Sequence, residues 1–463
     1  MKTKTKAFIL LLNEIHNNNN YLYNTLIMFG RFFYLFYIFI SESIKYHFTN
    51  LTYTLIYKLP KLERLTLVKS ITYKLEELNI IYVKVFQSLC LEKNILYEDE
   101  KEYLLKYTDN VPYKSEEVDY ELLDLIESKY NIRLEENQPI NSGIIGIVFK
   151  GIDGNANDSK VVIKILKNNI EKKLNSVLNE IECITYLFSY IPFLNNLNLH
   201  KLFLDNKESL LNQIDFLKEV SNIEIFRLKN QNLPEYRIPY VYKEITNIYN
   251  NVIIMENIKG LNINDIEKLD YNIKEEFGKI LLKFGFISIL YNSAIHCDLH
   301  AGNIFFYIND TNSGLPKYQL GLIDFGLCNF PDKNNQNIYY IFFDNFFYKK
   351  DFSNMEKFSN VIKTIIKEKE YYDNICYKKK EEFLLKIKNC LITTLEKEFD
   401  ITFISKLSKI FKNYNLNFSS EFNQISLSLA TCQSLGKTLC RSVTNTQYKC
   451  IEELTQINRL IEI

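Results

Sequence analysis

The sequence has 463 residues, of which 47% are hydrophobic, and this is enough for about two to three domain-sized units with their own cores. Its 56 lysines and arginines balance its 56 aspartates and glutamates, so no net charge attracts nucleic acid or anionic lipid. Such contacts must be local, and nucleic-acid binding is not expected. The nine cysteines show no CxxC pair and no zinc-ligand spacing, which predicts free thiols in a reducing intracellular compartment.

The segment 1–60 is rich in aromatic residues but lacks the pattern of a secretory signal. The apolar run after Lys6 is short, and no small-residue cleavage site follows it. A second apolar run, from Phe32 to Ile40, is too short to cross a bilayer, and extending it back to Tyr21 includes Arg31. Two interpretations stay open: a helix packed on a neighbouring helix, and a helix lying at a membrane surface.

Residues 61–131 show apolar positions three and four residues apart with charges between them, which predicts helices. One of these helices carries Lys84 and Gln87. Taken alone, such a pair is the solvated face of an amphipathic helix. Its meaning depends on motifs that lie further along the chain.

From Ile132 the sequence predicts two strands, a turn of Gly, Asn and Asp residues, and a third strand that carries Lys164 in VVIK. A kinase uses a lysine at this point to contact the α and β phosphates of the nucleotide. The preceding loop contains Gly143 and Gly146 and occupies the phosphate-covering position.

A kinase lysine needs an acidic partner on a helix, and the chain offers two places for it. Glu180 and Glu182 follow Lys164 at the separation usual for protein kinases. Glu219 lies much further on, ahead of a predicted strand and hinge that include Glu256. The residues alone do not decide between these places.

The stretch from His296 to Gly326 carries the strongest signal. Asp298 is followed by Asn303, then by two strand-like runs around the turn DTNSGLPK, and then by Asp324 of an Asp-Phe-Gly tripeptide. Mg²⁺ and a triphosphate require oxygen ligands from two converging loops, with a carboxylate beside the acceptor hydroxyl. Asp324 would hold the metal. Asn303 would hold a second metal or fix the loop. Asp298 would orient the attacking hydroxyl or accept its proton. The alternative is a pair of surface loops whose acids cap turns.

The loop HCDLHAGN, with His300 and Gly302, departs from the HRD-type loop of ordinary protein kinases. It resembles two groups, the small-molecule phosphotransferases of the aminoglycoside and choline kinase type and the UbiB/ADCK atypical kinases linked to coenzyme Q biosynthesis. The segment from Lys84 to Gln87 resembles the Lys-x-Gly-Gln signature of the second group, with Phe86 in place of glycine. The chain therefore resembles the UbiB/ADCK family from about Leu78 to Leu439.

The resemblance implies roles for further residues. The loop with Gly143 and Gly146 is similar to the family's alanine-rich nucleotide loop, with alanine largely lost. The segment with Gln213, Asp215 and Glu219 resembles its Glu-x-Asp helix, with glutamine replacing the first acid, and this order favours Glu219 as the partner of Lys164. Glu256 of the hinge is expected at the nucleotide, and Lys84 and Gln87 are expected to be regulatory.

The resemblance implies an α+β, two-lobed protein-kinase-like fold with an added N-terminal helical extension. We expect an aromatic segment at 1–60, the extension at 61–131, an N-lobe at 132–256 and a mostly helical C-lobe at 257–463. The implied activity is an ATP-dependent phosphotransferase or ATPase that binds ATP or ADP with Mg²⁺. It would act in isoprenoid-quinone or other lipid metabolism, with a lipid or quinone precursor as partner, and contact a membrane such as the mitochondrial inner membrane. The alternatives are a small-molecule kinase and a pseudokinase scaffold.

Overall fold

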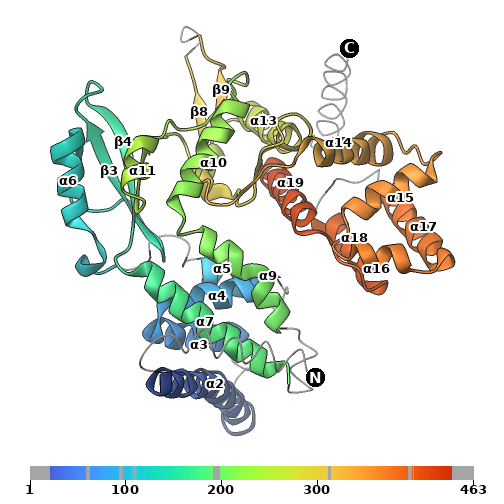
Figure 1. Cartoon of the computed structure of the whole chain (residues 1–463), viewed down its shortest axis with the longest axis horizontal. Coiled ribbons are helices and arrows are strands. Elements are labelled where there is room, and N and C mark those ends of the chain that lie inside the picture. The colour runs from blue at the N-terminus through green and yellow to red at the C-terminus, as the bar shows by residue number, and fades with distance from the viewer. Residues whose placement is uncertain are drawn as a thin grey trace. The chain divides into compact units, whose positions relative to one another are not determined.

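The computed structural model describes residues 21–58, 63–92, 97–105, 107, 111, 113–190, 199–310, 314–394, 399 and 401–440. The chain forms two compact units, whose elements are labelled in Figure 1. Unit 1 consists of residues 1–157 and 164–214, and unit 2 of residues 158–163 and 215–463. The four-segment division expected from the sequence stays a prediction.

The helices of unit 1 account for most of its described residues. They are α2 (Tyr21–Thr52), the π-helix η1 (Tyr53–Tyr57), α3 (Arg64–Leu78), α4 (Ile80–Glu92), α5 (Glu98–Leu105), the 3₁₀ turn η2 (Ser115–Glu117), α6 (Tyr120–Tyr130), α7 (Ile170–Phe188) and α9 (Leu199–Asn212). The helical pattern predicted for residues 61–131 is thus confirmed where the structure describes it. No helix among the described residues has both the length and the apolar character needed to cross a bilayer.

The strands of unit 1 follow the predicted hairpin. They are β1 (Ile132–Leu134), β2 (Asn141–Ser142), β3 (Gly146–Asp153) and β4 (Ser159–Leu166), and β1 and β2 both pair antiparallel with β3. Alternate residues of β3 and β4 are buried, as expected for strands with one face on a core. Asn157 and Asp158 adopt positive φ angles in the turn between them, a conformation that these two residue types tolerate well.

One hydrophobic cluster holds the helical extension and the start of the kinase-like region together. Helix α4 contributes Ile81, Val83 and Val85, and the loop between β2 and β3 contributes Ile144. Leu35 of α2, residues of α3, α5, α7 and α9, and Tyr107 and Val111 complete the cluster. The helices of the extension therefore share one core with α7 and α9.

Phe86, which stands where the UbiB/ADCK signature has glycine, has a packing partner within unit 1. Its ring lies 6.0 Å from the ring of Phe39 on α2, measured between centroids, and packs against the same hydrophobic cluster. A ring in place of the family's glycine would prevent close docking at this position. In this protein the ring of Phe86 instead connects α4 to α2.

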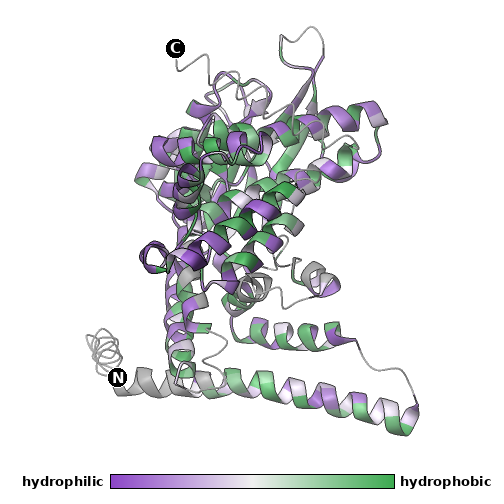
Figure 2. Cartoon of the chain, turned by 90° about the vertical axis from the view of Figure 1, so that its right-hand side faces the viewer, coloured by the Kyte–Doolittle hydropathy of each residue, from purple (hydrophilic) through white to green (hydrophobic). Residues whose placement is uncertain are grey.

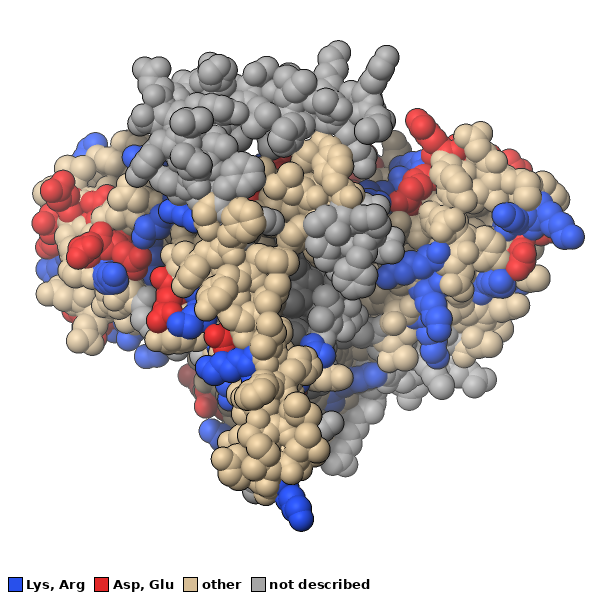
Figure 3. Space-filling view, turned by 90° about the horizontal axis from the view of Figure 1, so that it is seen from below, with Lys and Arg blue, Asp and Glu red and all other residues tan. Residues whose placement is uncertain are grey.

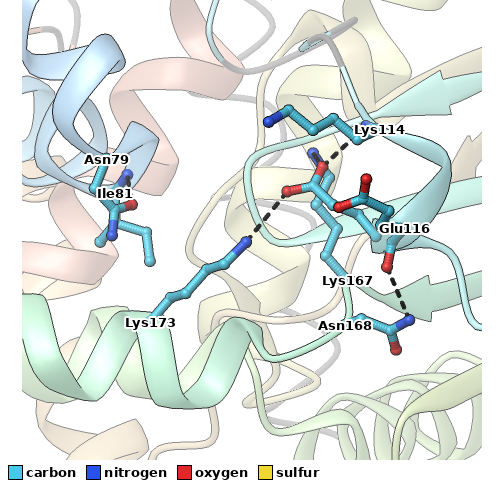
Figure 4. Close-up of polar contacts among 8 residues, drawn as sticks. Asn79, Ile81, Lys114, Glu116, Lys167, Asn168 and Lys173 are labelled. Atoms are coloured by element: carbon cyan, nitrogen blue, oxygen red, sulfur yellow. Dashed lines mark hydrogen bonds and ion pairs between the residues drawn. The ribbon is translucent and has the colours of Figure 1, made fainter.

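A buried ion pair connects the end of β4 to η2. The Nζ atom of Lys167 lies 3.3 Å from Glu117, and the Lys167 side chain is only 3% exposed. Lys173 of α7 contacts the same carboxylate at 3.3 Å, and the backbone N–H of Lys114 donates to it at 3.3 Å (Figure 4). The side chain of Asn168 donates to the carbonyl oxygen of Glu116 at 3.1 Å.

The charges of this cluster depend on one another. Burial lowers the pKa of Lys167, while the charge of Glu117 and its hydrogen bond oppose that shift. Burial alone would raise the pKa of Glu117, but the charge of Lys167 and hydrogen bonds from Lys114, Lys167 and Lys173 lower it. Lys167 also donates its backbone N–H to Ile145 at 2.9 Å, so the cluster holds the strand that bears Lys164 beside the β2–β3 loop.

Unit 2 contains the remaining strands. The first five residues of β4 belong to this unit, and β6 (Val252–Glu256) follows β4 in the strand order β1-β3-β4-β6. A second sheet has the order β5-β9-β8, made of β5 (Tyr236–Arg237), β8 (Ile304–Ile308) and β9 (Tyr318–Leu322). A two-stranded ladder pairs β7 (Ile295–His296) with β10 (Cys328–Asn329). The predicted strand–turn–strand between Asp298 and Asp324 is confirmed as β8 and β9.

The helices of unit 2 are α10 (Phe216–Lys229), α11 (Lys243–Ile248), α12 (Ile263–Ile266), α13 (Tyr271–Leu290), the 3₁₀ turn η3 (Ala301–Asn303), α14 (Lys333–Ile341), the π-helix η4 (Phe342–Tyr348), α15 (Met355–Thr364), α16 (Lys369–Asn374), α17 (Tyr377–Thr394), α18 (Ile401–Asn413) and α19 (Ser420–Leu439). Those from α13 onward, apart from η3, surround an aromatic core that includes Phe342, Phe346 and Phe358.

Two glycines set the spacing between α13 and α19. A Cβ atom on Gly278 would lie 2.5 Å from Cys440 Cβ, and one on Gly436 would lie 2.8 Å from Leu282. Any larger residue at these positions would push the helices apart, so glycine permits this close approach.

We predict that Glu117 stabilises unit 1 mainly through Lys167. Glu117→Gln leaves a buried ammonium without its counter-charge and should lower the free energy of unfolding by about 3 kcal/mol, whereas Lys173→Met should cost less than about 1 kcal/mol because Lys173 is exposed. Because folding lowers the pKa of Glu117, its contribution exists above the ordinary value of 4.5 and disappears as the pH falls through the folded value.

Urea unfolding of the single variants and of Glu117→Gln/Lys167→Met would measure these effects. The double variant should lose less stability than the sum of the two single losses. Strictly additive losses would show that the two side chains act independently.

Candidate active site

The ladder between β7 and β10 places the Asp298 loop beside the Asp-Phe-Gly segment. His296 pairs with Cys328 in antiparallel register, and the backbone N–H of Cys297 donates to the carbonyl oxygen of Leu327 at 2.9 Å. The residues that follow β7 therefore run alongside those that precede β10. The two acidic positions singled out in the sequence thus lie on adjacent segments of unit 2.

Asn303 connects the two segments directly. Its side-chain Nδ2 donates to the carbonyl oxygen of Asp298 at 2.9 Å, and its own carbonyl accepts from the backbone N–H of Ile323 at 3.1 Å. Asn303 is buried, while Asp298 is exposed. The buried amide fixes the loop, and the carboxylate of Asp298 is left facing solvent.

His300 closes the loop between these two residues. Its Nδ1 accepts the backbone N–H of Gly302 at 3.1 Å, which caps the short turn η3. The departure of this loop from the HRD type thus has a local structural effect, because the second histidine shapes the turn that presents Asn303.

Asp324 has an unusual backbone conformation, with a φ angle of +59°. Aspartate adopts this left-handed region more readily than most residues, but the conformation is still uncommon. The following residue pair turns back so that the N–H of Gly326 points at the Asp324 carboxylate, 3.4 Å from its Oδ1. Such outliers concentrate at functional sites, which fits the role predicted for Asp324.

Helix α10 is held on the Asp-Phe-Gly segment by side chains of one helical face. Asn222 donates through Nδ2 to the carbonyl oxygen of Phe325 at 2.8 Å, and the ring of Phe226 lies 5.0 Å from that of Phe325. Glu219, one turn earlier, is buried, and its Oε2 would lie 3.8 Å from a Cβ atom on Gly326. Glu219 and Asp324 therefore both lie beside Gly326.

His296 is a neutral side chain that supports the loop from its buried side. It is fully buried, its Nε2 donates to the carbonyl oxygen of Ile323 at 3.0 Å, and its ring packs 5.1 Å from that of Phe325. Burial lowers its pKa, while the bond to Ile323 and the charges of Asp298 and Asp324 act in the opposite direction. Its position inside the protein makes it a support for the loop.

The site carries a negative electrostatic field. Burial raises the pKa of the Cys328 thiol well above its usual range, and Cys297, Glu219, Asp324 and Asp298 raise it further. Burial also raises the pKa of Cys297 to about 12. Both thiols are protonated at neutral pH. The cysteines whose side chains the structure describes are free thiols, and they are Cys183, Cys297, Cys328, Cys376, Cys390, Cys432 and Cys440.

Helix α19 also contacts this region. The side-chain Oε1 of Gln424 accepts from Asn329 Nδ2 at 2.8 Å and from the Cys297 thiol at 3.9 Å. The loop that bears Asp298 is thereby supported from β10 and from the last described helix.

The residues present fit a hard divalent cation. Among the described residues no three His, Cys, Asp or Glu side chains gather as a metal site by themselves. Mg²⁺ needs no such set, because it binds through one or two protein oxygens together with phosphates and water. Asp324 supplies a carboxylate. Asn303 uses its Nδ2 for Asp298, and within the described part of the chain its Oδ1 accepts no hydrogen bond that would compete with a metal.

The predicted site residues of unit 1 lie on three elements. Lys164 is on β4, among the half-exposed residues of that strand, and Lys84 is half-buried on α4. Gly143 and Gly146 close the β2–β3 loop, where the N–H of Gly143 donates to the carbonyl oxygen of Gly146 at 2.9 Å. The side chain of Gln87 lies outside the described residues.

Two of the candidate acids have other partners within unit 1. Glu180 is buried and accepts from Arg31 of α2 at 2.5 Å, from Ser176 at 3.1 Å and from the hydroxyl of Tyr82 on α4. Glu182 pairs with Lys207 of α9 at 2.5 Å. These contacts leave Glu219 as the predicted partner of Lys164, and that pairing stays a prediction.

Glu256 ends β6 with its side chain engaged. Its carboxylate pairs with Arg237 of β5 and accepts the N–H of Tyr240 at 3.3 Å. Asp215, predicted within the Glu-x-Asp segment, caps α10 by accepting the N–H of Lys218 at 2.9 Å. The carboxylates of both residues therefore make structural contacts within unit 2.

Asn222 and Phe226 are site residues that no motif in the sequence pointed to. They follow Glu219 by three and seven residues, so a helical face through Glu219 contains both. This spacing is a signal that could have identified the residues that hold the Asp-Phe-Gly segment.

A model of the ABC1 atypical kinase-like domain matches residues 118–359. Over 264 residues the chain is 28% identical to the probable protein kinase UbiB of Marinobacter nauticus, covering 55% of this chain and 46% of that protein. It is 28% identical over 263 residues to an uncharacterized aarF domain-containing protein kinase of Arabidopsis thaliana, named as chloroplastic, covering 54% and 46%. The chain spans about half the length of these curated relatives.

Two solved structures are similar at low identity. The complex of Rv3197 with erythromycin from Mycobacterium tuberculosis is 16% identical, with a TM-score of 0.46 and coverage of 80% of this chain and 90% of that one. The Rio2 kinase–ADP/Mg²⁺–phosphoaspartate complex from Chaetomium thermophilum is 12% identical, with a TM-score of 0.30 and coverage of 64% and 76%.

The domain match covers more than half of the chain and includes Lys164, Glu219, Asp298, Asn303 and Asp324. Together with the mixed helices and sheets of the structure and the helices α2 to α5 that precede the match, it confirms the expected α+β, protein-kinase-like fold with an N-terminal helical extension. The chain belongs to the ABC1 atypical kinases, the UbiB/ADCK family.

Proposed function

We propose that this protein binds a nucleotide with Mg²⁺ and transfers or hydrolyses its terminal phosphoryl group. The observation that carries the proposal is the joint placement of Asp298, Asn303 and Asp324 by the β7–β10 ladder and the Asn303 amide. A triphosphate adds negative charge to a site that already contains these acids, so a divalent cation must accompany it.

Each residue has a role that follows from its environment. Asp298 is exposed at the end of a fixed loop and orients the attacking hydroxyl or water, or accepts its proton. Asp324 and the Oδ1 of Asn303 would hold Mg²⁺, which supplies charge neutralisation at the phosphates when bound. Lys164 contacts the α and β phosphates, and Glu219 holds that lysine in place. Gly143, Gly146 and the backbone at Glu256 contribute to the nucleotide site.

We further propose that the acceptor is a small molecule or water, in isoprenoid-quinone or other lipid metabolism. The support is family membership together with the integration of α4 into the core of unit 1. Lys84 and Gln87 act as regulatory residues on that helix. The names of the relatives, UbiB among them, motivate the substrate class and a location at a membrane.

Asp324→Asn should weaken the affinity for Mg-nucleotide by more than about tenfold, because it removes the charge that binds the metal. Asparagine tolerates the left-handed backbone of this position, so the loop should keep its shape. Cys328→Ala is the matched control within the same segment. Thermal-shift titration with ATP, with and without Mg²⁺, would measure the nucleotide affinity of both variants. Equal affinities of the two variants would refute the role of Asp324.

Lys164 and Glu219 should couple in a double-mutant cycle. The variants Lys164→Met and Glu219→Gln, alone and combined, are compared by nucleotide-supported thermal stability, and the combined loss should be smaller than the sum by about 1 kcal/mol or more. Glu182→Gln is the control, because Glu182 pairs with Lys207. Coupling of Lys164 to Glu182 with none to Glu219 would show that the assignment of the helix is wrong.

The intact chain should hydrolyse ATP but phosphorylate generic peptides poorly. If α4 covers the groove in which protein kinases place a peptide, only small acceptors reach the phosphate. A chain beginning near Asn131 would lose α2 to α6 and much of the core cluster of unit 1, so we expect it to be unstable. Radiolabel transfer to mixed peptides, with a conventional protein kinase as positive control, is the measurement. Robust peptide phosphorylation by the intact chain would contradict the small-acceptor proposal.

A further inference from the structure

Helix α2 has two opposite faces that differ in what they contact. On the inner face Leu35 belongs to the core cluster of unit 1, and Ile38 is buried. Arg31 pairs with Glu180 of α7, and Glu42 accepts the hydroxyl of Ser70 on α3 at 2.5 Å. These contacts fix α2 as an integral part of unit 1 and determine which of its faces points outward.

The outward face is an exposed apolar stripe, which we call the α2 stripe. Each of its side chains is between 42% and 69% exposed, and they are Phe33, Tyr37, Ile40, Ile44, Phe48, Leu51 and Leu55. In Figure 2, α2 carries hydrophobic residues along its described length. From Phe33 on α2 to Leu55 on η1 the stripe covers 22 residue steps, which is about 33 Å at the rise of an α-helix. Monomeric proteins rarely expose an apolar patch of this extent unless it binds something.

The spacing of the α2 stripe argues against a left-handed coiled coil and fits a flat surface or a right-handed coil. Its residues follow one another at steps of four, three, four, four, three and four, so the pattern repeats after 11 residues and three turns. That period is about 3.67 residues per turn, close to the 3.6 of a straight helix, so the stripe runs along the helix axis. A left-handed coiled coil with a second helix needs a stripe with a period of about 3.5 residues per turn. Such a stripe winds around the helix and does not run along its axis.

The charges beside the stripe favour an anionic partner. Between Phe33 and Lys58 the only acidic residue is Glu42, and its carboxylate is turned inward to Ser70. Lys45 and Lys58 are both exposed. Figure 3, which views the molecule from the side on which α2 lies, shows a long band of uncharged residues there. Aromatic and aliphatic side chains flanked by lysines are the composition of helices that lie in a lipid interface.

We infer that the α2 stripe docks on an anionic lipid bilayer, with the axis of α2 parallel to the membrane plane. The apolar side chains enter the boundary between headgroups and acyl chains, and Lys45 and Lys58 contact the headgroups. Helix α2 packs mainly on α3 and α7, and the ring of Phe39 at the side of the stripe contacts Phe86 of α4, the helix that bears Lys84. The inference deepens the membrane location proposed above and does not depend on the proposed nucleotide chemistry.

Vesicle flotation of the full chain tests the inference. The wild type should float with vesicles of phosphatidylcholine and phosphatidylglycerol, and Ile44→Glu/Phe48→Glu should reduce the bound fraction by about tenfold or more. Lys45→Glu/Lys58→Glu should abolish the preference for phosphatidylglycerol over pure phosphatidylcholine. Leu204→Glu is the control, because Leu204 is an exposed apolar residue of α9, outside the stripe. Circular dichroism and the thermal midpoint would verify that each variant is folded.

Three results would overturn the inference. One is a wild type that fails to float with anionic vesicles, and another is a folded stripe variant that floats as the wild type does. The third is a concentration-dependent dimer, measured by light scattering, that the stripe variant disrupts while neither protein binds vesicles. That result would assign the stripe to a second copy of the chain. None of these measurements depends on nucleotide hydrolysis, so they test the inference separately from the proposed nucleotide chemistry.

Discussion

The candidate site depends on one buried amide. Asn303 donates to the carbonyl oxygen of Asp298 and accepts through its own carbonyl from Ile323, the residue before Asp324. A single residue thus fixes both loops that carry the acids. Asn303 itself is buried, where an unmade hydrogen bond is costly, so its two bonds tie the loops to each other. The β7–β10 ladder, His296 and Gln424 reinforce the same arrangement.

Local patterns predicted the elements on which this arrangement is built. Aromatic and β-branched runs identified β3, β4, β8 and β9, and turn-forming residues located the connections between them. Helical spacing identified α3, α4 and α13. The two-residue strands β2, β5, β7 and β10 are too short to show any period, and they exist because neighbouring segments are placed to receive their hydrogen bonds. The β7–β10 ladder that aligns the acids therefore could not be read from periodicity.

The sequence also could not show which residues far apart in the chain contact each other. Arg31 and Glu180 are 149 residues apart, and nothing in either local pattern indicates that they meet. Glu117 and Lys167 each look like ordinary surface charges of short segments, although Lys167 is buried. Phe86 departs from the family pattern, which has glycine at this position. Its partner, Phe39, lies in a segment whose role the sequence left open, so a departure from the family pattern became interpretable only with both helices in place.

The contact of α19 with the segments around Asp298 has a consequence for mutations that shorten the chain. Gln424 supports Cys297 and Asn329, and the close approach at Gly278 and Gly436 fixes α19 against α13. Helix α13 leads directly into β7 and the Asp298 loop. A premature stop codon before residue 420 would spare every residue of the candidate site and still remove the scaffold that supports it. Null alleles of this gene should therefore include truncations far downstream of the chemistry.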